Sequence, residues 1–174
     1  MREVKYSGKI IEVVEERHGA RIFEFARRSP GVRALIVYND KMLLSREFRA
    51  EVNGYDYRLP GGKVFDTLTE YRKYADKDLT KFATAAVIKE VAEEVGLVCE
   101  KPRLIKVSKA GATIVWDLYY FEIIDFIKSK QNLEEGEDIT FNWYTFDEVK
   151  QFCLENQVQE DRSVAVILKY LLKR

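Results

Sequence analysis

Cysteine is scarce in this chain, and its scarcity excludes two classes of small protein. Cys99 and Cys153 are the only two cysteines among the 174 residues. Two scattered thiols are too few for a disulfide framework or for a tetrahedral zinc site. They are typical instead of free, partly buried thiols in a cytosolic protein.

Long hydrophobic runs and an excess of one charge are also absent. No apolar run approaches the roughly 20 residues that span a bilayer, and residues 1–9 lack the apolar core of a signal peptide. The 29 basic residues balance the 29 acidic ones, so no overall field draws the chain to nucleic acid or to an anionic membrane. We therefore predict a cytoplasmic protein with no nucleic-acid and no membrane partner.

What the chain does contain is enough apolar side chain for a folded core. Hydrophobic residues make up 47% of the sequence and aromatic residues 13%, which argues against disorder. No internal repeat and few linker-like stretches interrupt it. We expect a single domain over residues 1–174, long enough to bury about 70% of its unfolded surface.

Apolar alternation and turn residues predict the order of the elements. Residues 4–15 and 20–26 read as two strands of an N-terminal hairpin, with a turn at His18-Gly19. Further strands are expected at residues 33–38, 41–46, 103–108, 113–124 and 140–145, and residues 55–59 lead into a glycine turn. Helices are expected at 146–155 and 162–172, with Asp161 as a cap of the second. Together with one acidic helix, these elements predict an α/β fold, an α/β/α sandwich with a mixed central sheet.

The most informative segment is a glycine turn followed by that acidic helix. Residues 59–63 read Leu-Pro-Gly-Gly-Lys, and residues 85–97 read Ala-Ala-Val-Ile-Lys-Glu-Val-Ala-Glu-Glu-Val-Gly-Leu. Glu90, Glu93 and Glu94 are three or four residues apart and project from neighbouring turns. Gly96 is placed to end the helix in a left-handed conformation. Carboxylates gathered in this way repel one another unless a cation lies between them, and oxygen ligands suit a hard divalent ion.

Turn and helix together resemble the Nudix box, Gly-x5-Glu-x7-Arg-Glu-U-x-Glu-Glu-x-Gly-U, in which U is aliphatic. Residues 89–97 match its second half, with Lys89 in place of the arginine, and Gly62 matches its glycine. Residues 67–81 are an insertion within the box. The insertion obscures the first box glutamate; Glu70 is the expected replacement, and Asp78 could instead cap the helix.

Outer segments extend the resemblance to the ADP-ribose pyrophosphatase-like subfamily. Residues 23–32 and 43–49 are similar to that subfamily, and residues 143–149 resemble a strand-to-helix junction common to Nudix proteins. Residues 108–112 depart from it, because they lack the subfamily's proline. The resemblance implies hydrolysis of the pyrophosphate linkage in ADP-ribose or a related nucleotide sugar. It also implies a homodimer formed through the N-terminal strands as a plausible assembly.

The resemblance further assigns residues to the metal. Mg²⁺, or Mn²⁺, is expected to bind Glu90, Glu93, Glu94 and the carbonyl of Gly62, where it would neutralise the diphosphate and activate water. Lys89 would orient a glutamate through an ion pair, although lysine lacks the planar fork of arginine and could equally be a surface residue.

The base and the substrate contacts are the remaining roles. The general base is expected to be a box glutamate or an acid of the late loop that holds Glu134, Glu135 and Glu137, with Glu137 favoured. Substrate binding is assigned to Arg28 and Arg49, together with the turn residues Gly61 and Gly62. Two surface arginines are the competing interpretation.

Two other functions remain open. The insertion within the box could have abolished catalysis, and the chain would then be a module that binds a nucleotide without hydrolysing it. A Nudix-like isomerase of diphosphate esters would need a catalytic cysteine, and neither Cys99 nor Cys153 is well placed in the sequence for that role.

Overall fold

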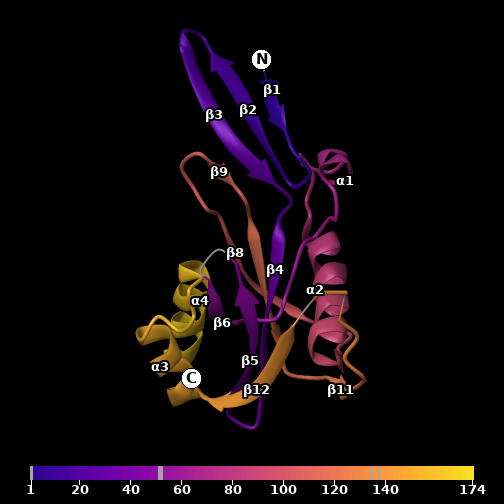
Figure 1. Cartoon of the computed structure of the whole chain (residues 1–174), viewed down its shortest axis with the longest axis vertical. Coiled ribbons are helices and arrows are strands. Elements are labelled where there is room, and N and C mark those ends of the chain that lie inside the picture. Colours follow the sequence, from indigo (N-terminus) through magenta and orange to yellow (C-terminus); the bar gives the residue numbers. More distant parts are fainter. Residues whose placement is uncertain (1, 51–52, 134, 137) are drawn as a thin grey trace.

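The computed structural model describes residues 2–50, 53–133, 135–136 and 138–174. Its centre is a mixed sheet with strand order β12-β5-β4-β10-β8, in which β6 also pairs with β5 (Figure 1). The strands are β4 (Gly31–Tyr38), β5 (Lys41–Arg49), β6 (Gly54–Arg58), β8 (Arg103–Ser108), β10 (Leu118–Ile123) and β12 (Ile139–Thr145). Only β10 and β4 run parallel among these pairs. The predicted mixed sheet is therefore confirmed.

Helices cover both faces of the central sheet, as the sandwich prediction requires. Along β4 the side chains alternate, so Ala34 packs toward α2 (Thr80–Val95) while Leu35 packs toward α3 (Phe146–Leu154) and α4 (Asp161–Leu171). Figure 1 shows α2 on one side of the sheet and α3 with α4 on the other. Apart from Arg33, this strand is apolar and joins two hydrophobic cores.

The helix α2 follows the predicted pattern of one apolar face. Its residues Val87, Val91 and Val95 are buried, and Gly96 ends it in the left-handed conformation at φ 61°. A Cβ at Gly96 would come within 2.8 Å of the Ser129 carbonyl oxygen. At the other end, the Thr80 N–H donates to Asp78 Oδ1 over 3.0 Å, so Asp78 does satisfy a backbone donor at the helix start.

The insertion within the acidic motif is an ordered part of the fold. It forms α1 (Leu68–Arg72) and the segment that leads into α2. Leu68, Tyr71 and Leu79 are buried in the core under α2. A small sheet of β7 (Leu97–Val98) and β11 (Ile127–Lys128) lies beyond the C-terminal end of the helix.

A separate sheet precedes the sandwich and projects from it (Figure 1). It has the order β1-β2-β3-β9, formed by β1 (Arg2–Ser7), β2 (Ile11–His18), β3 (Arg21–Arg28) and β9 (Ile114–Val115). The turn after His18 is confirmed, with Gly19 at φ 62°. The single strand expected over residues 4–15 is wrong, because the chain turns back where the Gly8 N–H bonds to the Ile11 carbonyl over 2.8 Å.

Two other boundaries also differ from expectation. Residues 113–124 form β9 and β10 instead of one strand, because β9 pairs with β3 and β10 with β4. Asp161 is the first residue of α4 and Glu160 is its N-cap, with no side-chain cap bond. The predicted cap is thus one residue too late. Within the described residues, no helix is long and apolar enough to cross a bilayer.

Candidate active site

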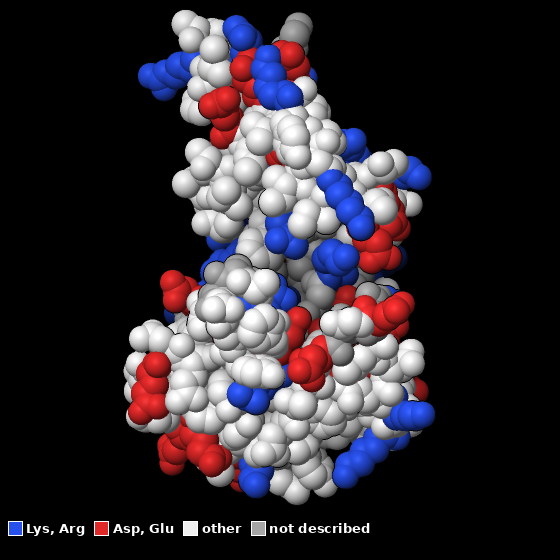
Figure 2. Space-filling view, in the orientation of Figure 1, with Lys and Arg blue, Asp and Glu red and all other residues white. Residues whose placement is uncertain are grey.

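A cavity of about 600 Å³ lies where the glycine turn, α2 and the ends of several strands meet. Figure 2 shows the molecule hollowed below the N-terminal sheet, with basic and acidic side chains both at the border. The carboxylates come from α2, from β5 and, for Asp66, from the segment after the glycine turn, and the guanidinium groups come from β3, β4, β5 and β6. The cavity therefore combines oxygen ligands for a cation with donors for an anion.

The carboxylates of α2 converge on the glycine turn. The Gly61 N–H donates to Glu94 Oε2 over 2.9 Å. The Glu90 carboxylate lies against Gly62, where an added Cβ would be only 2.2 Å from Glu90 Oε1. Gly61 itself has φ 148°, and a Cβ there would be 2.1 Å from the Val32 carbonyl oxygen. Glycine is thus required at both positions, because a side chain would clash with the Glu90 carboxylate at Gly62 and with the backbone at Gly61.

Burial raises the pKa of Glu94 to about 8. The neighbouring carboxylates Glu90 and Glu47 act in the same direction, while the Gly61 N–H and Arg33 oppose the rise. A divalent cation beside Glu94 would act in the opposite direction and stabilise its charged form.

Glu93 does not join these carboxylates. Its Oε2 lies 3.1 Å from Lys89 Nζ, one turn earlier on α2. Among the described residues, no three acidic, histidine or cysteine side chains come together closely enough to form a ready metal site. This arrangement fits Mg²⁺, which retains several waters and needs one or two carboxylates together with substrate phosphate.

The basic side of the cavity includes both predicted arginines. The Arg28 guanidinium lies 4.5 Å from the centroid of the Trp116 ring. Arg49 Nη1 lies 3.1 Å from Glu47 Oε1. Arginine donors placed opposite a carboxylate cluster suit a phosphate-rich ligand.

A family model of the Nudix domain matches residues 27–165. This match spans most of the chain, including every residue of the cavity except Lys9. The chain belongs to the Nudix family. It is a Nudix pyrophosphohydrolase by class, and its fold is the Nudix fold.

Solved structures agree with this fold. The crystal structure of an ADP compounds hydrolase is 17% identical, with a TM-score of 0.70 over 99% of this chain and 90% of that chain. A MutT Nudix hydrolase from Burkholderia pseudomallei is 24% identical, with a TM-score of 0.51 over 68% of this chain and 84% of that chain. No curated protein matched. At these identities the structural likeness concerns the fold.

The first glutamate of the Nudix box is the position where prediction and structure part. Glu70 lies exposed on α1 and does not line the cavity. Asp66 lines it instead and contributes to raising the pKa of Lys89, behind the larger effect of Glu93. The apolar side of α1 packs into the core, so Glu70 lies on the solvent-facing side of this helix and outside the cavity.

The Nudix general base stays a prediction. Glu137, the favoured candidate, lies outside the described residues, as does Glu134. Glu135 is exposed. The Gly62 carbonyl, expected as a metal ligand, accepts the Val32 N–H over 2.9 Å and retains a second lone pair.

Several cavity residues were not foreseen from the sequence. They are Lys9, Arg33, Glu47, Arg58, Lys63, Asp66 and Trp116. A signal existed for Arg33, because a charged residue inside an otherwise apolar strand is unusual and needs a buried partner. Arg58 directly precedes the glycine turn, which was a second signal.

Neither cysteine is available for isomerase chemistry. Cys99 and Cys153 are both buried, and neither lines the cavity. Burial raises the pKa of Cys153 to about 11, so its thiolate is scarce at neutral pH.

Proposed function

We propose that this Nudix protein hydrolyses the pyrophosphate linkage of a nucleoside diphosphate derivative with the help of Mg²⁺ or Mn²⁺. The observation that carries the proposal is the convergence of Glu90 and Glu94 on the Gly61–Gly62 turn, inside a cavity that also holds arginine donors. Carboxylates bind the cation and arginines bind the phosphates, so the two halves of the cavity serve one substrate.

The reaction adds one water molecule across the diphosphate. The water oxygen bonds to one phosphorus, the bridging P–O bond breaks, and two phosphomonoesters leave. A bound divalent ion supplies charge neutralisation and lowers the pKa of water. Glu90, Glu94 and the Gly62 carbonyl would hold the ion, with Glu93 as a further ligand once it leaves Lys89. Arg28 and Arg49 would orient the phosphates, and an acidic side chain, Glu137 or a box glutamate, would take the proton.

ADP-ribose or a related nucleotide sugar is the leading substrate. The resemblance of residues 23–32 and 43–49 to the ADP-ribose pyrophosphatase-like subfamily supports this choice. The fold likeness to an ADP compounds hydrolase over nearly the whole chain is in agreement.

The proposal is tested by hydrolysis of ADP-ribose, nucleotide sugars, dinucleoside polyphosphates and nucleoside triphosphates, with and without Mg²⁺. The variant Glu94→Gln should lower kcat/KM by at least about 100-fold, since a metal ligand and its charge are lost. The exposed Glu100→Gln serves as a matched control, because Glu100 lies outside the cavity. Equal loss in both variants, or turnover that ignores Mg²⁺, would contradict a metal site at Glu94.

A nucleotide-binding module is the second candidate. It is favoured by the separation of Glu93 from the other two carboxylates, which leaves the three-glutamate set unassembled. Binding of ADP-ribose in the absence of metal, with no turnover of any substrate, would select this function.

A further inference from the structure

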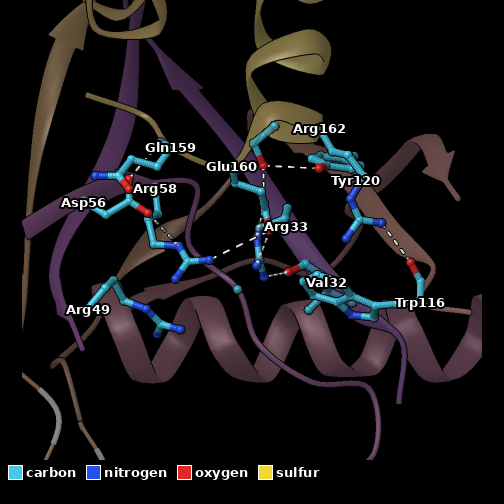
Figure 3. A network of polar contacts seen from close by, with 12 residues as sticks. Val32, Arg33, Arg49, Asp56, Arg58, Trp116, Tyr120, Gln159, Glu160 and Arg162 are labelled. Carbon is cyan, nitrogen blue, oxygen red and sulfur yellow. Dashed lines mark hydrogen bonds and ion pairs between the residues drawn. The ribbon is translucent and has the colours of Figure 1, made fainter. Parts of the chain in front are cut away.

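The cavity holds more arginine than a diphosphate and its metal ions account for. Besides Arg28 and Arg49, it is lined by Arg33 and Arg58. Figure 3 shows the guanidinium groups of Arg33, Arg49 and Arg58 pointing toward a common space beside α2. These groups come from three strands, so their meeting is a product of the sheet and not of local sequence.

Arg33 is neutralised by a dedicated partner. It is 6% exposed, and its Nε and Nη2 donate to the two carboxylate oxygens of Glu160, each over 2.9 Å. Its Nη1 donates to the Val32 carbonyl over 2.9 Å. Burial opposes the charge of Glu160, but Arg33 outweighs this effect and the pKa of Glu160 is lowered. Arg33 is therefore a fixed, paired cation at the wall of the cavity.

Arg58 differs, because no carboxylate of the described residues reaches it at hydrogen-bond distance. Its shortest ion-pair distances are 3.6 Å to Asp56, 3.8 Å to Glu47 and 3.8 Å to Glu160. Its side chain is nonetheless only 15% exposed. Three ion pairs at these distances compensate its charge only in part, and an anionic ligand in the cavity can add the short, charge-assisted hydrogen bonds that these pairs do not supply.

The three carboxylates near Arg58 are each engaged more closely elsewhere. Asp56 Oδ1 accepts the Gln159 N–H over 3.0 Å. Glu47 contacts Arg49, and Glu160 holds Arg33. Asp56 and Glu47 each use one oxygen for the closer contact, and the other oxygen lies 3.6 Å and 3.8 Å, respectively, from Arg58. Within the described part of the chain, Arg58 therefore has ion-pair partners but no hydrogen-bonded carboxylate, and its donors are available to a ligand.

Electrostatics within the cavity agree with an excess of positive charge. Burial lowers the pKa of Arg58, and repulsion from Arg33 and Arg49 lowers it further. Burial also lowers the pKa of Arg28, again with help from neighbouring arginines. Both stay protonated at neutral pH, and both therefore gain when an anion enters.

We propose that Arg58, beside the diphosphate-binding Arg28 and Arg49, provides a second anion subsite that binds a phosphomonoester group of the substrate outside the hydrolysed linkage. Glu160 is a positioning residue, because it holds Arg33 at the wall of this subsite. The inference rests on the proposed hydrolase function and narrows its substrate class to nucleoside diphosphate derivatives with one additional phosphate.

Paired substrates that differ by that phosphate test the subsite. We expect kcat/KM for ADP-ribose 2′-phosphate, or for a 3′-phosphorylated analogue, to exceed that for ADP-ribose by about 10- to 100-fold. In Arg58→Gln the preference should fall toward one, with Arg58→Lys in between. Arg46→Gln is the matched control, since Arg46 stacks on Tyr55 and does not line the cavity. It should retain the wild-type preference.

If Arg58→Gln lowers kcat/KM equally for both substrates of a pair, the inference is overturned, because Arg58 would then bind the diphosphate itself. A wild-type protein without preference would overturn it as well, while leaving the hydrolase function intact.

Calorimetry without metal separates the two proposals. Adenosine 3′,5′-bisphosphate and adenosine 2′,5′-bisphosphate are compared with AMP on wild type and Arg58→Gln. Tighter binding of a bisphosphate that depends on Arg58 would support the subsite even where no substrate turns over. Indistinguishable affinities for all three would refute it.

Discussion

At the scale of single residues, the two glycines of the turn do different work. Gly61 needs its positive φ and its proximity to the Val32 backbone, which cannot move aside. At Gly62 the three atoms nearest to an added Cβ all belong to the Glu90 carboxylate, the flexible end of a side chain. Gly61 therefore serves the fold, and Gly62 serves the placement of one carboxylate.

This difference predicts opposite phenotypes for two alanine variants. Gly62→Ala should push Glu90 off the turn and lower kcat/KM by about 100-fold, as a displacement near 1 Å can, with little change in Tm. Gly61→Ala should destabilise the protein by about 1–3 kcal/mol or more through overpacking against the backbone. Thermal melts and kcat/KM for both variants provide the check. A stable, active Gly61→Ala would contradict the close approach.

At the scale of elements, a buried carboxylate fastens the inserted helix to the N-terminal sheet. Glu12 of β2 is fully buried and accepts from Arg27 Nε of β3 over 2.6 Å and from Arg72 Nε of α1 over 2.8 Å. Arg72 also donates to Ser7 Oγ of β1 over 2.7 Å. The insertion thereby connects three strands of one sheet to the core under α2.

Removing Arg72 should weaken this attachment in a pH-dependent way. Burial opposes the charge of Glu12, but Arg72 and Arg27 outweigh it, and the pKa of Glu12 lies below its ordinary 4.5. The resulting stability is present above pH 4.5 and is lost as the pH falls through the lower, folded-state pKa. Arg72→Gln should cost about 1–3 kcal/mol at pH 7, and the difference from wild type should narrow below pH 4.5.

Urea denaturation at a series of pH values measures this effect. Arg17→Gln is the control, since Arg17 pairs with Glu15 of the same sheet but its own side chain is exposed, and ion pairs with an exposed partner contribute little. A loss for Arg72→Gln that stays constant down to pH 3 would show that Glu12 is not its cause.

At the scale of the whole molecule, the projecting sheet exposes apolar side chains. Its register places Tyr6, Val13, Ala26 and Ile114 in one row across the four strands. Tyr6 is 61% exposed and Ile114 is 44% exposed. An exposed apolar row on a sheet favours association with another copy, in keeping with the homodimer that the family resemblance implies.

Sedimentation velocity tests this assembly. We expect the wild type to sediment as a dimer at micromolar concentration and the double variant Tyr6→Lys, Ile114→Lys as a monomer. Ile127→Lys, at an exposed site on β11, should leave the dimer unchanged. A monomeric wild type would contradict the expected dimer.

The sequence by itself determined the local chemistry of this protein. The spacing of Glu90 and Glu94 sets them on adjacent turns, and Gly96 ends their helix, because both features depend only on helical geometry. The glycine turn and the Nudix box were recognisable in the sequence because both are short local motifs.

Tertiary structure decided which distant residues share the cavity. Arg33, Arg58 and Glu160 meet because strand pairing and the packing of α4 bring separate segments to one place. Glu70 lies outside the cavity because burial of Leu68 and Tyr71 fixes the orientation of α1. Local spacing carries no information on such contacts, since they follow from register and from the burial of apolar area across the whole chain.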